Sequence, residues 1–153
     1  MEFPTVQELF DLTGRVALVT GGARNLGFDT ALALAEAGAD VAITSRNLEH
    51  ARASAIRITQ QTGRRAPPLR LDVTQEDQVE AAADACLAEY GRIDILVNNA
   101  GNAASLPDPA PIHKRSLEDW RETIDTNMTG TFLCSTHVLA KAMIPAYGGS
   151  ISN

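Results

Sequence analysis

The sequence predicts an α/β fold, a doubly wound parallel sheet with helices packed on both of its faces. Short apolar segments alternate strictly with helical patterns along the 153 residues of the chain. The apolar segments are continuous rather than alternating, as expected of parallel strands that are buried on both faces. Because crossovers between parallel strands are right-handed, few strand orders remain. The natural one is 3-2-1-4-5, with a topological switch between strands one and four.

Five segments have the composition of buried strands. The first runs between Gly14 and Gly21, which mark its two ends. The third begins late, because Pro67 and Pro68 cannot donate to the ladder of a central strand. The fifth has only its opening residues before Asn153. The predicted strands are residues 16–20, 41–45, 68–72, 93–98 and 150–153.

The first two helices are predicted from apolar spacing and from the glycines that follow them. Leu26, Ala31 and Ala35 can share one face of the first helix. Gly38 supplies the left-handed residue that ends it, and Gly63 follows the second helix. These two helices are predicted over residues 25–37 and 47–61.

The third and fourth helices begin at segments that resemble capping boxes, residues 74–77 (Thr-Gln-Glu-Asp) and 116–119 (Ser-Leu-Glu-Asp). The third helix runs to the residue before Gly91, and the fourth ends before Pro145. Between the fourth strand and the fourth helix, residues 102–115 contain three prolines and are predicted to be a loop.

Composition indicates one core, so we treat residues 1–153 as a single domain. A net charge of −6 argues against a nucleic-acid-binding protein, since no basic excess is available to engage phosphates. The three histidines have no metal-ligand spacing, and no apolar run is long enough to span a membrane. Two cysteines and the lack of a signal-peptide core favour a cytoplasmic location. A small-molecule ligand is therefore the expected partner.

Unusual polar residues collect where the predicted strands end. They lie in the four loops 20–27, 45–46, 72–73 and 98–101. Carboxyl ends of parallel strands share one edge of the sheet, and ligands bind at the switch point of that edge. The first and fourth loops are neighbours there, so a single site is expected.

The first loop, Thr-Gly-Gly-Ala-Arg-Asn-Leu-Gly, is rich in glycine and opens a helix. Glycines let the backbone approach a diphosphate, and the helix N-terminus favours its negative charge. A phosphate-binding NTPase loop is excluded, because Phe28 and Asp29 stand where lysine and serine or threonine are required. The loop therefore predicts a dinucleotide site.

The second loop distinguishes between two cofactors. An NAD site requires an acidic residue at the end of the second strand, to bind the ribose 2′-hydroxyl group. This chain has Ser45 and Arg46 there, and Arg24 could make a second contact with a 2′-phosphate. We therefore expect NADP(H), with NAD(H) the less favoured cofactor. The alternative is that Arg46 is a solvated residue before a helix.

The motifs together resemble the short-chain dehydrogenase/reductase family over essentially the whole chain. They are Thr20 to Gly27, Asp72-Val73, Asn-Asn-Ala-Gly at 98–101 and Asn127. Residues 10–20 resemble the start of the gluconate/sorbose-type sugar and polyol reductases of that family. The resemblance implies a Rossmann-type fold and a homo-oligomeric enzyme that moves hydride between a nicotinamide and a carbonyl or alcohol group. A flavodoxin-like domain is disfavoured by the Asn-Asn-Ala-Gly motif.

The resemblance also implies the site. Asp72 and Val73 would hold the adenine, and residues 99–101 would line the adenosine ribose. Asn25 stands where the family usually has glycine, so we expect a left-handed backbone there and weakened binding. The predicted cofactor-binding residues are Gly21, Arg24, Asn25, Leu26, Gly27, Ser45, Arg46, Asp72, Val73, Asn99, Ala100 and Gly101.

Asn127 is the one catalytic candidate. It lies in residues 126–131 (Thr-Asn-Met-Thr-Gly-Thr), a cluster of weak helix formers in the middle of a predicted helix. The resemblance implies that this asparagine bends the helix and anchors a water molecule in a proton relay. The alternative is a simple break between two helices.

The family's serine and its Tyr-x-x-x-Lys pair are not found in the chain. The residue four positions after Tyr90 is Asp94, and the one four positions after Tyr147 is Ile151. We therefore expect the chain to be the N-terminal part of a longer enzyme, with these residues beyond Asn153. The alternative is a dinucleotide-binding module or regulatory fragment without catalysis. Substrate specificity would arise partly in the loop 102–114.

Overall fold

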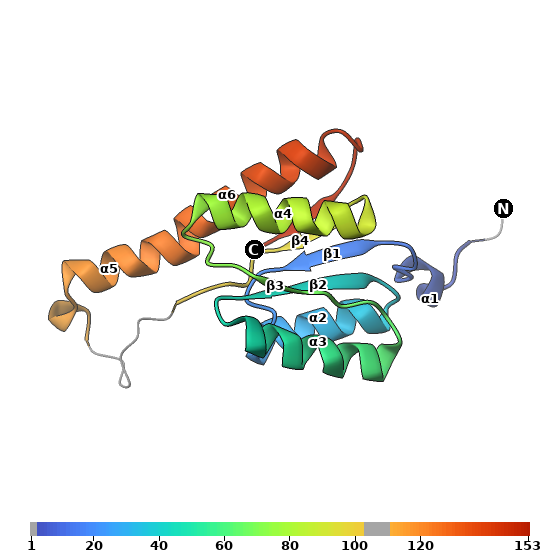
Figure 1. Ribbon diagram of the computed structural model, residues 1–153, viewed down its shortest axis with the longest axis horizontal. Helices are drawn as coiled ribbons and strands as arrows, with labels where there is room; N and C mark the ends of the chain where they lie inside the picture. The colour runs from blue at the N-terminus through green and yellow to red at the C-terminus, as the bar shows by residue number, and fades with distance from the viewer. Residues whose placement is uncertain (1–2, 103–110) are drawn as a thin grey trace.

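The computed structural model describes residues 3–102 and 111–153. Its centre is a five-stranded sheet in the order β3-β2-β1-β4-β5, as predicted (Figure 1). All four pairs of neighbouring strands are parallel. The strands are β1 (Val16–Val19), β2 (Asp40–Ser45), β3 (Pro68–Arg70), β4 (Ile95–Val97) and β5 (Ser150–Ser152).

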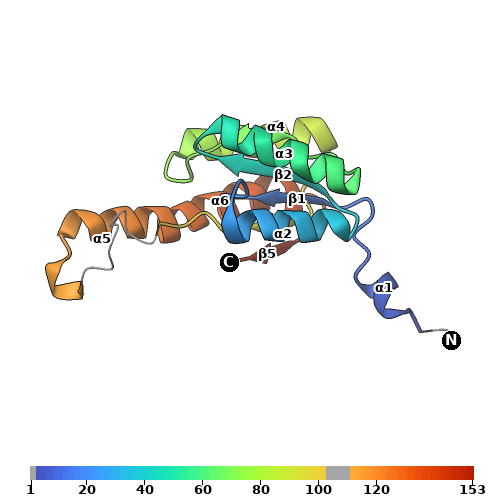
Figure 2. The same ribbon diagram turned by 90° about the horizontal axis from the view of Figure 1, so that it is seen from below.

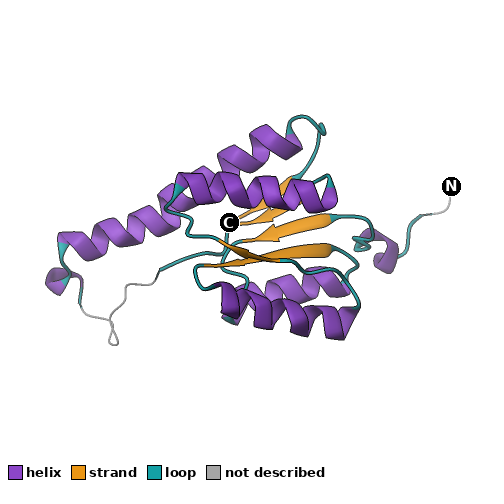
Figure 3. Cartoon of the chain, viewed as in Figure 1, coloured by secondary structure: helices purple, strands orange, loops and turns teal. Residues whose placement is uncertain are grey.

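Helices cover both faces of this sheet (Figure 2). Helices α2 (Asn25–Glu36) and α3 (Leu48–Thr62) pack on one face, and α4 (Glu76–Tyr90) and α6 (Gly130–Val138) lie on the other (Figure 3). Helix α5 (Leu117–Ile124) projects beyond the sheet edge, and the unpredicted helix α1 (Val6–Leu9) stands apart near the N-terminus. The shorter elements are η1 (Ile112–Lys114), η2 (Asp125–Thr129) and η3 (Leu139–Met143).

The two faces of the sheet form two apolar clusters, as a side-chain period of two along each strand requires. In β1, Val16 and Leu18 join the cluster under α4 and α6, whereas Ala17 and Val19 join the cluster under α2 and α3. Every residue of β1 is buried. This burial on both faces explains why the strand is a continuous apolar run in the sequence.

Both cysteines belong to the cluster under α4 and α6. Cys86 and Cys134 are buried free thiols, and burial raises the pKa of each to about 12. A thiol with so high a pKa carries almost no thiolate at neutral pH and is a poor nucleophile. The two side chains therefore serve as small apolar core residues.

One of the two predicted capping boxes is wrong. Helix α4 begins at Glu76, and its N-cap Gln75 makes no side-chain hydrogen bond to the helix. The backbone N–H and the hydroxyl of Thr74 instead donate to Asp72 Oδ1, at 3.0 and 2.8 Å. An aspartate side chain commonly accepts a hydrogen bond from the backbone N–H two residues later. Because the Thr74 hydroxyl donates to Asp72, it does not cap the first turn of α4. The capping box of Ser116 and Asp119 is confirmed.

The long fourth helix is continuous, so the alternative of a break within residues 126–131 is wrong. Asp125 and Thr129 keep right-handed helical angles, with φ near −62° and −64°. The chain widens into a π-turn over η2 and again over η3. Such turns absorb poor helix formers without ending the helix.

Most of the predicted loop 102–115 lies outside the described residues, but its end contains the short helix η1. Across residues 3–102 and 111–153, no helix combines the length and the apolarity needed to cross a membrane.

Candidate functional site

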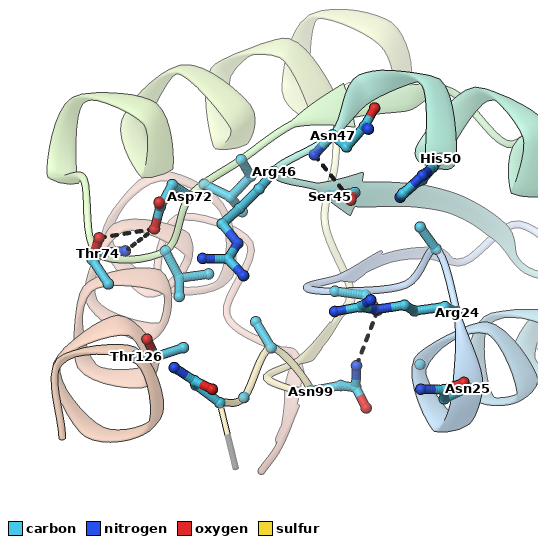
Figure 4. A pocket seen from close by; sticks show the side chains of 18 of the residues that line it. Arg24, Asn25, Ser45, Arg46, Asn47, His50, Asp72, Thr74, Asn99 and Thr126 are labelled. Carbon is cyan, nitrogen blue, oxygen red and sulfur yellow. Dashed lines mark hydrogen bonds between the residues drawn. The ribbon is translucent and has the colours of Figure 1, made fainter. Parts of the chain in front are cut away.

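A cavity of about 630 Å³ opens at the carboxyl ends of β1, β2, β3 and β4 (Figure 4). The loops after these strands form its walls, and Glu122 and Thr126 close one side. Every predicted cofactor-binding residue lines this cavity, although the prediction drew them from four separate loops. They are Gly21, Arg24, Asn25, Leu26, Gly27, Ser45, Arg46, Asp72, Val73, Asn99, Ala100 and Gly101.

Thr20 joins the loops that follow β1 and β4. Its hydroxyl donates to the Val97 carbonyl at 3.2 Å and accepts from the backbone N–H groups of Asn99 and Ala100, each at 3.0 Å. The Thr20 side chain is 1% exposed. In return, Asn99 Nδ2 donates to the carbonyls of Thr20 and Gly21 at 3.0 and 3.2 Å. Four of these hydrogen bonds join the two loops, and the fifth joins Thr20 to the last residue of β4, so the loops at the switch point keep a fixed relation.

The glycine loop is packed against this network. Gly21 has a φ of +64°, and a Cβ atom there would lie 3.1 Å from Ala100 Cα. At Gly27, a Cβ atom would overlap Asn99 Nδ2 and the Gly21 carbonyl oxygen. Gly21 is therefore required by its left-handed backbone conformation, and Gly27 is required by the close approach of Asn99 and of the Gly21 carbonyl.

The first turn of α2 fits an anionic group. Its N-cap residue, Arg24, provides no side-chain acceptor, whereas the N-cap of α3, Asn47, accepts from the Glu49 N–H at 2.9 Å. The amides at the start of α2 are thus without a side-chain cap on the cavity wall. Backbone amides and the positive end of the helix dipole stabilise negative charge there.

Asn25 opens α2 with a φ of +49°, so the expected left-handed backbone is confirmed. Its side chain is exposed and lines the cavity. The expected weakening of cofactor binding by this residue stays a prediction.

Two arginines bring positive charge to the cavity. Arg24 comes from the glycine loop and Arg46 from the end of β2, and both side chains extend into the cavity (Figure 4). Within residues 3–102 and 111–153, the ion pairs involve neither of these guanidinium groups. Ser45 stands beside them where an NAD site requires a carboxylate, and its hydroxyl accepts from the Asn47 N–H at 3.2 Å.

Asp72 and Val73 form the opposite wall. The Asp72 carboxylate is oriented by its two bonds from Thr74, and the Asp72 N–H donates to Gln78 Oε1 at 3.0 Å. Val73 is buried against Gly130, where an added Cβ atom would overlap the valine side chain. The absence of a side chain at Gly130 thus lets the long helix approach the wall.

Asn127 lies behind the cavity rather than on its wall, whereas its neighbour Thr126 lines it. Its Oδ1 accepts from the Asn102 N–H at 2.8 Å, and its Nδ2 donates to the Asn102 carbonyl at 3.3 Å. The side chain therefore fixes the segment that follows Gly101. The role in a proton relay stays a prediction.

Sequence reasoning missed several residues of the cavity wall. His50 lies in the first turn of α3, and no helical spacing relates it to Arg46, because Arg46 precedes the N-cap Asn47. Glu122 faces the loop after β4 and accepts from Asn102 Nδ2 at 2.7 Å. The unpredicted lining residues are Ala23, Asn47, His50, Leu71, Thr74, Asn102, Glu122 and Thr126.

Neither tyrosine contributes to the cavity. Burial, followed by the charge of Asp40, raises the pKa of Tyr90, and the arginine Arg65 lies over its ring at 4.4 Å. Tyr147 is 99% exposed. The residues that line the cavity therefore provide binding groups, and neither phenol is placed to act as an acid beside them.

The known proteins that this chain resembles in sequence are dehydrogenases. The family model for short chain dehydrogenase matches residues 15–153. D-threitol dehydrogenase of Mycolicibacterium smegmatis is 44% identical over 94% of this chain and 53% of its own length. The 2-dehydro-3-deoxy-D-gluconate 5-dehydrogenase of Formosa agariphila is 34% identical over 95% of this chain and 53% of its own length.

Solved structures agree in fold. A short-chain type dehydrogenase/reductase from Mycobacterium marinum has a TM-score of 0.87 at 41% identity, covering 96% of this chain and 56% of that one. A metagenomic short-chain oxidoreductase in complex with NADP has a TM-score of 0.81 at 35% identity, covering 92% and 62%. The chain spans about half the length of the curated relatives it matches. With the family model covering nearly all of its residues, the chain belongs to the short-chain dehydrogenase family.

Proposed function

We propose that the chain is the dinucleotide-binding domain of an NADP(H)-dependent oxidoreductase. The enzyme would transfer hydride between the nicotinamide and a carbonyl or alcohol group of a small molecule, such as a sugar or polyol. The observation that carries this proposal is the pair of Arg24 and Arg46 on the cavity wall, with Ser45 in place of the carboxylate that binds a ribose diol. Two guanidinium groups match a 2′-phosphate in charge and in hydrogen-bonding geometry.

Each wall of the cavity has a part in this proposal. The amides at the start of α2 would hold the diphosphate, and the two arginines would hold the 2′-phosphate. Asp72 and Val73 would border the adenine, and the segment from Asn99 would border the adenosine ribose. The bound nicotinamide would supply or accept the hydride, and turnover would need a proton donor that neither tyrosine of this chain provides.

The relatives support the proposed chemistry. Two of them are named for the oxidation of a polyol and of a sugar acid, and one structural neighbour binds NADP. These enzyme names also disfavour the alternative of a binding module without catalysis.

Replacement of Arg46 by alanine tests the proposed cofactor preference. The loss of one charge-assisted contact should weaken NADPH binding by about 1.5–3 kcal/mol, roughly ten- to hundredfold, and leave NADH binding within about twofold. Fluorescence titration of the purified chain with each cofactor measures both affinities. Arg52→Ala is the matched control, because this exposed arginine pairs with Glu49 outside the cavity. Equal losses for NADPH and NADH would contradict the proposal.

A further inference from the structure

We propose that His50 is a specificity-determining residue that donates a hydrogen bond to the ribose 2′-phosphate, together with Arg24 and Arg46. This inference rests on the proposed function and adds a third binding group to it. His50 is the third residue of α3, and its exposed imidazole lines the same cavity as the two arginines. Figure 4 shows the imidazole next to Ser45, in the part of the cavity that Arg24 enters.

The local backbone holds His50 in this place. The hydroxyl of Ser45 accepts from the Asn47 N–H, and Asn47 Oδ1 accepts from the Glu49 N–H. These two bonds connect the end of β2 to the first turn of α3. The imidazole therefore projects from a fixed helix start rather than from a free loop, which limits the entropy lost when it binds a ligand.

The charges around His50 favour an anion. Its acidic neighbour Glu49 is directed to Arg52, with 2.6 Å between the ion-pair atoms. The acidic residues on the cavity wall are Asp72, which accepts from Thr74, and Glu122, which accepts from Asn102. Both carboxylates are thus engaged with other groups of the wall. In Figure 4 the guanidinium group of Arg24 lies on the same side of the cavity as the imidazole, whereas that of Arg46 extends toward the side of Asp72.

A terminal phosphate has several acceptor oxygens, more than one arginine can satisfy. Arg24 and Arg46 approach from the glycine loop and from the end of β2, and His50 adds an N–H donor from α3. The positive end of the α3 dipole adds to the same field. A ribose 2′-hydroxyl group lacks the charge and the extra oxygens, so this contact discriminates between NADP(H) and NAD(H).

Binding measurements on His50→Ala and His50→Gln test the inference. NADPH and adenosine 2′,5′-bisphosphate should bind His50→Ala about five- to tenfold more weakly than the wild-type chain. NADH and adenosine 5′-monophosphate, which lack the 2′-phosphate, should bind within about twofold of wild type. His50→Gln keeps a donor and should recover part of the loss. His113→Ala is the matched control, because this exposed histidine of η1 lies outside the cavity wall and should change neither affinity.

The outcomes separate this inference from the proposed function. If Arg46→Ala weakens NADPH selectively and His50→Ala does not, the role of His50 is refuted and the cofactor preference stands. If His50→Ala weakens NADPH and NADH equally, the residue does not recognise the 2′-phosphate. If the wild-type chain binds no NADPH, the proposed function fails, and the inference fails with it.

Discussion

The Gly27→Ala substitution is expected to destabilise the chain by about 2–4 kcal/mol and to weaken cofactor binding about tenfold or more. The added methyl group would overlap Asn99 Nδ2 and the Gly21 carbonyl oxygen. Asn99 would have to move, and it would lose its bonds to the carbonyls of Thr20 and Gly21. Urea denaturation measures the stability, and titration with NADPH measures the binding.

Gly148→Ala is the matched control for this substitution. A Cβ atom at Gly148 meets no heavy atom within 4 Å, and the backbone there is outside the left-handed region. This variant should have nearly the stability of the wild-type chain. If the alanine variants of Gly27 and Gly148 were equally stable, the close packing of the glycine loop on Asn99 would be wrong.

Thr20→Val is expected to have the second large effect, a loss of about 2–4 kcal/mol. Valine has nearly the shape of threonine, but it leaves the N–H groups of Asn99 and Ala100 without their acceptor in a buried place. The segment after β4 should then loosen, and NADPH should bind more weakly. Thermal and urea unfolding with parallel NADPH titrations measure both effects.

Thr44→Val provides a graded comparison. Thr44 is also fully buried, but its hydroxyl accepts a single long bond, from the Gly21 N–H at 3.3 Å. We expect a loss of about 1 kcal/mol for this variant. A Thr44→Val loss as large as that of Thr20→Val would mean that the shared bonds to the β4 loop do not dominate the stability of the site.

The sheet and its order could be predicted because they depend on patterns that are local and strong. A strand buried on both faces, such as β1, is a continuous apolar run, and right-handed crossovers then determine the neighbours. The same reasoning brings the ends of the strands to one edge. For this reason every predicted cofactor-binding residue lines the one cavity there, although its role in binding stays a prediction.

Details that depend on competition between side chains could not be predicted. Thr74 has the sequence context of a capping residue, but its hydroxyl and its backbone N–H donate hydrogen bonds to the Asp72 carboxylate instead. The sequence does not show which partner is favoured, because both are local and of similar energy.

Contacts between distant parts of the sequence could not be predicted either. The hydrogen bond from the Asn99 N–H to the Thr20 hydroxyl spans 79 positions, and no local pattern indicates it. His50 was missed because an exposed histidine on a helix is common, and only the structure shows that it lines the same cavity as Arg24 and Arg46.

The resemblance to the family did not predict the contacts that Asn127 makes in the structure. Its position in the family pattern predicted a role in proton transfer, and the structure gives it two bonds to the backbone of Asn102. The weak helix formers around it produce a π-turn within a continuous helix. Helix propensity predicts an irregularity at such a cluster but not its form, because packing of the turns decides between a break and a widening.

Binding of a nicotinamide dinucleotide at the edge formed by the carboxyl ends of the strands can be measured by amide chemical-shift mapping of the ¹⁵N-labelled chain during titration with NADPH. Saturable shifts are expected to concentrate in residues 21–27, 45–50, 72–74 and 99–102, the segments that line the cavity. Shifts confined to the opposite edge, around Arg15, Arg92 and Gly148, or no shifts at millimolar NADPH, would contradict binding at this site.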